Sequence, residues 1–351
     1  MILNYLENKK ISYSRVEELL DICTRHNVFT NNGPVKLMLE GKIAELIGLP
    51  LNKKVICVNN GTAALQSLIF YFEYIKQKKM LWGIPAFTFP SPVVNHNTCK
   101  IFDIDIDTLT IDCNVNIDEV DGIIITNLFG TVVDIDYWVD KCRDKNKILI
   151  FDNSSSFISK YKGSNICSYG DASFGSLHHT KFLGFGEGGF IVIDAEIKDY
   201  ISGITNFGFI GNHAYKPDSF NFKMSDVSAC FILQHIESYD LKLHLEVQNK
   251  ILNCLNSIDG FFVFKGHESD IVYGSMPVIF NEEIDLSGFR RLGIEANKYY
   301  MPLDTHCINA MNIYKRIINL PIYQSISEYQ IEYMSRIIKM QIKEICETRS
   351  K

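Results

Sequence analysis

The stretch Ser173–Gly189, SFGSLHHTKFLGFGEGG, places a single lysine, Lys181, among apolar and small residues. Partial removal from water disfavours the charged form of a lysine, so its amine becomes nucleophilic closer to neutral pH. Such an amine is suited to forming a Schiff base with a carbonyl compound. Ser176 offers a hydroxyl to an anion five residues earlier, and the later glycines allow a tight return into the next strand. We therefore interpret Lys181 as a reactive amine.

A second motif, Asn59–Leu65 (NNGTAAL), lies earlier in the chain, where a strand is expected to turn into a helix. The free backbone N–H groups and the dipole at the start of a helix favour a phosphate group. Gly61 lets the backbone approach such a ligand, Thr62 adds a hydroxyl, and Ala63 completes the turn. By itself the motif fits an ordinary capped helix start equally well.

A third motif, Phe151–Ser156 (FDNSSS), directly follows an apolar run and contains Asp152. A carboxylate at the C-terminal end of a parallel strand lies where open α/β sheets bind ligands. There it could keep the nitrogen of a pyridine ring protonated through a charge-assisted hydrogen bond. Taken alone, Asp152 would more readily be a helix N-cap or a turn residue, and Lys181 a solvated charge. The order of phosphate turn, ring aspartate, serine and lysine argues against these alternatives.

Short apolar segments alternate with helical patterns through the first two thirds of the chain, which favours a mostly parallel sheet covered by helices on both faces. A smaller α+β domain should follow, so we expect domains at 1–240 and 241–351. The predicted strands are Lys54–Val58, Gly122–Thr126, Ile148–Phe151, Gly189–Ile193, Phe261–Phe264 and Tyr273–Phe280, and the predicted helices are Thr62–Tyr74, about Ser225 to Leu255, and a C-terminal one from Ser327.

The composition excludes several functions. The formal net charge of -6 provides no broad positive field for nucleic acid or an anionic membrane. The ten cysteines contain no C-x-x-C pair, so we expect reduced thiols in a cytoplasmic protein and no metal site. The N-terminus lacks the apolar core of a signal peptide, and no later stretch approaches the length of a membrane span.

From Thr30–Pro34 to Leu320–Pro321 the chain resembles the DegT/StrS family of sugar aminotransferases, which are fold-type I pyridoxal 5′-phosphate (PLP) enzymes. The family pattern of serine, histidine, lysine and then Gly-Glu-Gly-Gly is matched by Ser176, His178, Lys181 and Gly186–Gly189. The resemblance implies that Lys181 forms the Schiff base with PLP and that Ser176 and the Gly61–Ala63 turn bind its phosphate.

The family's Pro-x-x-Thr-aromatic segment falls on Pro85–Phe89, which implies that Phe89 stacks on the cofactor ring; without the resemblance, Phe89 would be read as a core aromatic. Asn221 matches an asparagine that in relatives crosses a dimer interface to the neighbour's cofactor phosphate, so a homodimer with shared active sites is implied. Read plainly, Asn221 could be a turn residue. We also expect substrate contacts from Asn31, His178 and Tyr300.

Three positions depart from the family pattern. Ser155 stands where glutamine or histidine often lies near the phenolic oxygen of the cofactor, Lys223 replaces an arginine, and Leu177 replaces an aromatic residue. Lysine cannot reproduce the bidentate contacts of arginine. Because no reactive group is lost, these departures bear on substrate recognition more than on the chemistry.

The resemblance implies transfer of an amino group from L-glutamate to a nucleotide-linked keto sugar. The expected reaction converts dTDP-4-keto-6-deoxy-D-glucose to dTDP-4-amino-4,6-dideoxy-D-glucose (dTDP-viosamine), with C3 amination of a dTDP-3-keto-6-deoxyhexose as the alternative. Two other classes remain open: a PLP-dependent sugar dehydratase, in which the lysine position holds histidine, and a non-catalytic PLP-binding paralogue. Lys181 argues against the first, and the complete set of lysine, aspartate and serine argues against the second.

Overall fold

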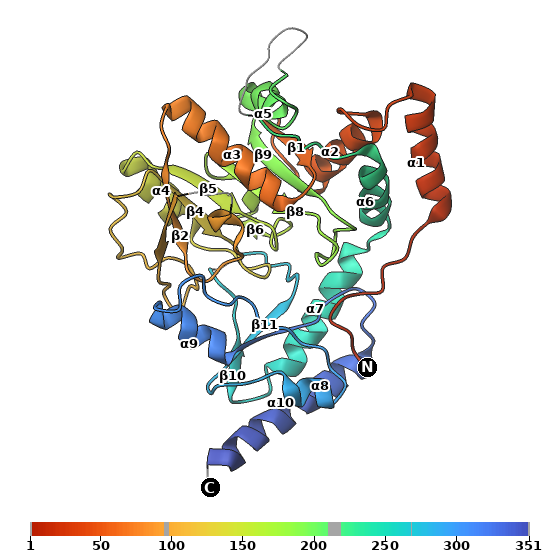
Figure 1. The fold of residues 1–351 in the computed structure, drawn as a ribbon. Helices are drawn as coiled ribbons and strands as arrows, with labels where there is room; N and C mark the ends of the chain where they lie inside the picture. Colours follow the sequence, from red (N-terminus) through yellow and green to blue (C-terminus); the bar gives the residue numbers. More distant parts are fainter. Residues whose placement is uncertain (1, 95–97, 210–218, 268, 350–351) are drawn as a thin grey trace.

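The computed structural model describes residues 2–94, 98–209, 219–267 and 269–349, and its centre is a seven-stranded sheet (Figure 1). The strands lie in the order β1-β9-β8-β5-β4-β2-β3. Their bounds are β1 Lys53–Val58, β2 Leu81–Pro85, β3 Thr98–Phe102, β4 Gly122–Thr126, β5 Ile148–Asp152, β8 Ala172–Ser176 and β9 Gly189–Asp194. A two-stranded hairpin, β6 (Lys160–Tyr161) and β7 (Ser164–Asn165), lies outside this sheet.

Strand direction brings several strand ends to one edge of the sheet. β3, β2, β4, β5 and β8 pair in parallel, whereas β9 pairs antiparallel to both β8 and β1. The C-terminal ends of β1, β8, β5, β4 and β2 therefore meet at the same edge, which we call the carboxyl edge. The prediction of a mostly parallel, mixed α/β sheet is confirmed.

The alternation of side chains along the strands explains why helices cover both faces. Ile124 and Ile150 contribute to one buried cluster with α3 and α5, whereas Ile123, Ile125 and Phe151 face a second cluster with α1, α2, α4 and α6. These helices are α1 Tyr13–His26, α2 Pro34–Leu46, α3 Gly61–Lys76, α4 Ile135–Asp144, α5 Lys198–Ile204 and α6 Asp226–Ser238.

The rest of the chain builds a smaller unit, the C-terminal lobe, around a three-stranded antiparallel sheet in the order β10-β11-β12 (Figure 1). Its elements are α7 Leu241–Leu255, β10 Phe261–Val263, β11 Met276–Phe280, α8 Ser287–Arg291, α9 Ile308–Arg316, β12 Ile317–Leu320 and α10 Glu328–Arg349. A buried cluster joins this lobe to the central sheet unit, with Phe87 and Phe129 on one side and Ile279 and Ile313 on the other.

The first residues belong spatially to the C-terminal lobe. Leu3 is buried in the core of that lobe and pairs with Ile294 through a parallel bridge. The chain then runs along the molecule to α1, which lies beside α6 (Figure 1). We call residues 2–12 the N-terminal strap, because this segment spans from the C-terminal lobe to the large sheet unit.

Two sequence predictions about secondary structure are wrong. The expected helix from Ser225 to Leu255 is two helices, because Tyr239 is extended and Asp240 caps a new helix by accepting a hydrogen bond from the Leu243 amide at 3.0 Å. The expected strand from Tyr273 to Phe280 begins only at Met276. The residues before it are held instead by non-strand contacts, such as the bond from the Tyr273 amide to Gln248 Oε1.

The described residues contain neither a membrane-spanning helix nor a cluster of metal-binding side chains. No helix there is long and apolar enough to cross a membrane. Nor do the side chains in those ranges gather three or more histidine, cysteine, aspartate or glutamate residues that could hold a metal ion.

Candidate functional site

Strand register brings the sequence motifs together at the carboxyl edge. Asp152 is the last residue of β5 and lies opposite Thr126 on β4 and Phe174 on β8. Ser176 ends β8 opposite Gly189, and Gly189 is in turn opposite Val58 at the end of β1. The phosphate turn (residues 59–65), Asp152 and the lysine loop (residues 176–189) are therefore neighbours, although more than a hundred residues separate the first motif from the last.

Asp152 and Lys181 form the charged centre of the site. Asp152 is 2% exposed, and its Oδ1 accepts a hydrogen bond from the Ser154 amide at 2.9 Å. Burial raises the pKa of the Asp152 carboxyl, while the Ser154 bond and the charge of Lys181 oppose that rise. Burial lowers the pKa of the Lys181 amine, and Asp152 opposes it. The lysine thus has the desolvated amine that its sequence context predicted.

A compact cradle lies between α3 and Ser176. The Asn60 side chain caps α3 by accepting from the Ala63 amide at 2.8 Å, and the first intrahelical bond runs from Ala64 to the Asn60 carbonyl. The Gly61 and Thr62 amides therefore precede the helical ladder, at the positive end of the dipole. A Cβ on Gly61 would lie 3.3 Å from the Ser176 Cβ. This close approach, with a hydroxyl and helix-start amides together, fits a phosphate group.

Aromatic rings border the centre from both lobes. Tyr300 of the C-terminal lobe stacks on Phe129 with centroids 5.7 Å apart, and it meets Phe89 edge to face at 6.3 Å. Burial and the Asp152 charge raise the pKa of the Tyr300 phenol. Phe89 is 53% exposed, which is incompatible with a core aromatic and leaves its ring face available to a ligand.

Two further predicted residues flank this centre. Ser155 Oγ accepts from the Phe129 amide at 3.0 Å and donates to the Asn127 carbonyl at 3.2 Å, so backbone contacts fix its hydroxyl. His178 is half-buried; its amide donates to Ser176 Oγ and its Nδ1 lies 2.8 Å from Thr180 Oγ1. Ser155 thus contacts the backbone of Phe129, and His178 contacts the hydroxyl of Ser176.

Asn221 and Asn31 lie farther from the charged centre. Asn221 is exposed and its Oδ1 accepts from Lys223 Nζ, while the Phe222 carbonyl accepts from the Asn59 amide at 2.9 Å. The segment thus passes beside the phosphate turn, with the Asn221 side chain facing outward. Asn31 is exposed with a left-handed backbone (φ 59°) ahead of α2. Among the described contacts, none joins Asn31 to Lys181 or Asp152.

Sequence reasoning missed the residues that hold the lysine loop from outside. Lys9 of the strap donates to backbone oxygens of that loop, and His235 of α6 bonds to the Phe182 carbonyl at 2.8 Å. Neither residue belongs to a motif. The only signal in the sequence was their residue type, because the contacts span 170 and 53 positions along the chain.

A lysine with a desolvated amine, a buried aspartate at the end of a parallel strand and a candidate phosphate cradle on the adjoining helix are the features expected at the site of a fold-type I PLP enzyme. Residues 11–339 match the model of the DegT/DnrJ/EryC1/StrS aminotransferase family. The chain belongs to this family, as the resemblance predicted. It is a PLP-dependent sugar aminotransferase, and the predicted cofactor is confirmed at the level of the family.

Individual relatives are distant but align over most of their length. The chain is 26% identical to the dTDP-4-amino-4,6-dideoxy-D-glucose transaminase of Shigella dysenteriae, with 91% of this chain and 94% of that protein covered. Helicobacter pylori PseC, an aminotransferase involved in the biosynthesis of pseudoaminic acid, shares the fold with a TM-score of 0.83 at 16% identity, covering 97% and 98%. A GDP-4-keto-6-deoxymannose-3-dehydratase (ColD) also shares it, with a TM-score of 0.80 at 17% identity, covering 96% and 100%.

Proposed function

We propose that this enzyme transfers the amino group of L-glutamate to dTDP-4-keto-6-deoxy-D-glucose and releases dTDP-4-amino-4,6-dideoxy-D-glucose (dTDP-viosamine). The observation that carries the chemistry is the combination of Lys181, whose pKa burial lowers, with the buried Asp152 carboxylate at the carboxyl edge. The observation that favours this sugar is the similarity to the Shigella dysenteriae transaminase, which extends over 91% of the chain.

Each residue of the site has a defined task in this proposal. PLP supplies an electron-withdrawing ring next to the carbon that loses a proton. Asp152 holds a proton on the ring nitrogen, because a buried carboxylate beside a cation keeps that cation charged. Lys181 Nζ would hold the cofactor between turnovers and would carry the proton that leaves the α-carbon of the donor.

The surrounding groups fix position and exclude water. Ser176 Oγ and the amides of Gly61 and Thr62 would hold the phosphate, and the exposed Phe89 would offer its ring to the cofactor. Tyr300 closes the site from the C-terminal lobe through its stack on Phe129. Excluding water strengthens the interaction between Asp152 and its partner charge, since the local dielectric falls.

The substrate assignment is tested with purified protein, PLP, L-glutamate and a panel of dTDP- and GDP-linked 4-keto and 3-keto sugars. We expect 2-oxoglutarate to form stoichiometrically with a dTDP-4-amino sugar, identified by NMR. Formation of a 3-amino sugar would replace the proposal by C3 amination. Loss of the C3 hydroxyl without a new amine would instead assign a dehydratase, and absence of any turnover by PLP-loaded protein would indicate a non-catalytic paralogue.

A homodimer with shared sites forms the second part of the proposal. Asn221 faces outward beside the phosphate turn, and the nearby Phe207 and Phe209 are 47% and 55% exposed. A second copy of the chain would cover these side chains and bring its Asn221 to the neighbouring phosphate. Large apolar side chains exposed close together are typical of such interfaces.

Complementation tests the sharing of sites. Lys181→Ala and Asn221→Ala variants, each inactive as homodimers, are mixed under conditions of proven subunit exchange. One site of a mixed dimer then carries both lesions and the other neither, so activity should reappear. A mixture that exchanges subunits but stays inactive, or an active monomer, would contradict the shared site.

A further inference from the structure

The lysine-bearing loop holds a second cationic side chain that no motif marks. Lys9 Nζ, from the N-terminal strap, donates to the carbonyl oxygens of His179 at 2.7 Å and Lys181 at 2.6 Å, and also to that of Gly184. Lys9 is half-buried, and its three donors match three acceptors of one loop. The Lys9 ammonium, 172 positions earlier in the sequence, thus binds the backbone carbonyl of Lys181.

The loop itself supplies a donor to only one of these carbonyls: the Gly184 amide donates to the Lys181 carbonyl at 2.9 Å, and no described loop amide donates to those of His179 and Gly184. Its flanks are bonded to each other, with the Leu177 amide on the Gly188 carbonyl and the His179 amide on the Gly186 carbonyl, each at 2.8 Å. Inside that ladder the turn at Lys181 to Gly184 points carbonyls toward Lys9. Carbonyl groups removed from water need hydrogen-bond donors, and the Lys9 ammonium supplies one donor to each of the three carbonyls.

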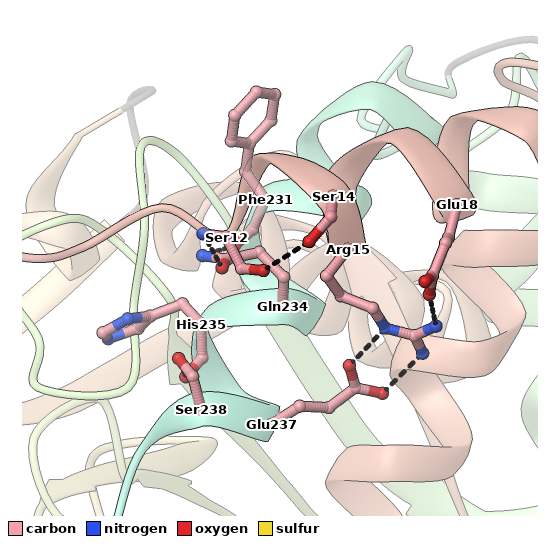
Figure 2. A network of polar contacts seen from close by, with 9 residues as sticks. All are labelled: Ser12, Ser14, Arg15, Glu18, Phe231, Gln234, His235, Glu237 and Ser238. Atoms are coloured by element: carbon pink, nitrogen blue, oxygen red, sulfur yellow. Dashed lines mark hydrogen bonds and ion pairs between the residues drawn. The ribbon is translucent and has the colours of Figure 1, made fainter.

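The strap that carries Lys9 is fixed at both ends. The amides of Ile2 and Leu3 donate to the Gly293 carbonyl of the C-terminal lobe. At the other end the Ser12 amide donates to Gln234 Oε1 of α6 at 3.0 Å, and Arg15 pairs with Glu237, as Figure 2 shows. Lys9 therefore reaches the loop from a backbone that is itself restrained.

We propose that Lys9 is a positioning residue, which holds the Lys181 loop in the conformation that presents the Lys181 amine to the cofactor. The inference rests on the proposed role of Lys181. Lys9 does not touch substrate or cofactor in this assignment. It acts through the carbonyl of Lys181 itself and through the carbonyls on either side of it.

The charges around Lys9 support an ammonium in this place. Glu7 of the same strap favours the charged form, while burial lowers the Lys9 pKa to about 8. His179 of the loop and His235 of α6 also face it; burial lowers the pKa of both imidazoles, and the Lys9 charge adds to that effect. These effects favour neutral imidazoles at His179 and His235 beside a charged Lys9.

The test compares Lys9→Met, which keeps an apolar stem and removes the ammonium, with Lys10→Met at the exposed neighbouring position. Hydrogen exchange is followed in the cofactor-free protein, in a peptide covering 177–189 and in one covering β4. We expect Lys9→Met to speed exchange at least tenfold in the loop peptide alone. Loaded with PLP, it should show a kcat reduced about tenfold or more, an altered visible absorbance and a nearly unchanged KM for the sugar.

A rescue experiment separates positioning from a merely structural role. In Lys9→Ala, added ammonium or K⁺ could occupy the carbonyl cage, so either ion should restore part of kcat and of the loop protection, whereas Lys10→Met should behave as wild type throughout. Unchanged loop exchange in Lys9→Met, or equal acceleration in the loop and in β4, would overturn the proposal. Hydrogen exchange is measured without cofactor, so it tests the role of Lys9 alone. The proposed role of Lys181 fails by a different result, namely a cofactor attached to another lysine.

Discussion

The lysine loop and the N-terminal strap contact each other, yet only the loop carries a recognisable sequence motif. The loop, residues 176–189, combines a serine, a lysine and four glycines in a recognisable pattern. The strap, residues 2–12, has no pattern, although Lys9 binds three loop carbonyls. Residues whose own atoms react need a particular identity and spacing. Residues that donate a hydrogen bond to the backbone of a distant segment need only a donor group that reaches it, so they form no motif.

The reactive groups and the contacts that support them lie on different parts of the fold. The amine, carboxylate and phosphate cradle lie on strand ends, where the pairing of the sheet fixes them. The conformation of the loop that carries the amine depends on contacts from the strap and α6. We therefore expect changes in the loop to abolish chemistry, changes in its supports to reduce it, and changes at the far anchor of the strap to affect stability alone.

The largest effect should come from Lys181→Ala. Loss of the covalent attachment and of the proton carrier should lower kcat for transamination by about 10⁴-fold. Borohydride reduction of wild-type protein loaded with PLP should trap a pyridoxyl group on Lys181, found by peptide mapping, and the variant should trap none. A pyridoxyl group mapped to another lysine would remove Lys181 from the centre of the site.

The next effect should come from Asp152→Asn, which keeps the shape and one hydrogen-bonding oxygen but removes the charge. A charge-assisted hydrogen bond is worth about 1.5–3 kcal/mol, so we expect kcat to fall roughly tenfold to a hundredfold while PLP affinity changes little. Equilibrium dialysis and single-turnover kinetics measure the two quantities separately. Transamination at the wild-type rate would mean that Asp152 does not hold the ring nitrogen.

How far the sequence predicted this molecule can be judged from individual residues. Gly122–Thr126 is the predicted strand to the residue, because a run of apolar side chains buried on both faces leaves few alternatives. The break at Tyr239 was missed, since an apolar pattern continues through both helices and only Asp240 marks the new start. Asp152 could be placed at one edge of the sheet, because it follows a predicted strand and the C-terminal ends of parallel strands meet at the same edge. Lys9 and His235 could not, because no local rule links a donor to a carbonyl elsewhere in the chain.

His235, the second residue that holds the lysine loop from outside, should make the free energy of unfolding depend on pH. Burial lowers the pKa of His235 and of His244 to about 4, from 6.5. Unfolded protein then binds more protons than folded protein between these values, so the free energy of unfolding is fully retained above pH 6.5 and falls as the pH drops toward 4. His235→Gln can still donate to the Phe182 carbonyl but cannot titrate. We expect it to remove about half of the pH dependence that His235 and His244 together contribute, measured by urea unfolding.

The matched variant for this experiment is His244→Gln, which should remove the other half, since His244 Nε2 bonds to the Tyr273 carbonyl at 2.9 Å in the C-terminal lobe. Only His235→Gln should also change hydrogen exchange in the lysine loop. If both variants altered the loop equally, His235 would not be a specific support of it. An unchanged pH slope in both would contradict the assignment of these imidazoles as buried and neutral.

The smallest effect should come from Arg15→Ala, at the far anchor of the strap. Arg15 pairs with Glu237 through Nε and Nη2 at 2.9 and 3.1 Å, and both side chains are about one third exposed. Water and salt screen such a pair, so its removal should lower the free energy of unfolding by less than about 1 kcal/mol, and the difference should shrink in high salt. The Ser12 bond to Gln234 remains, so Lys9 should stay in place and kcat should not change. A loss of loop protection comparable to that of Lys9→Met would show instead that the strap acts as one unit, and would end the distinction between support and anchor.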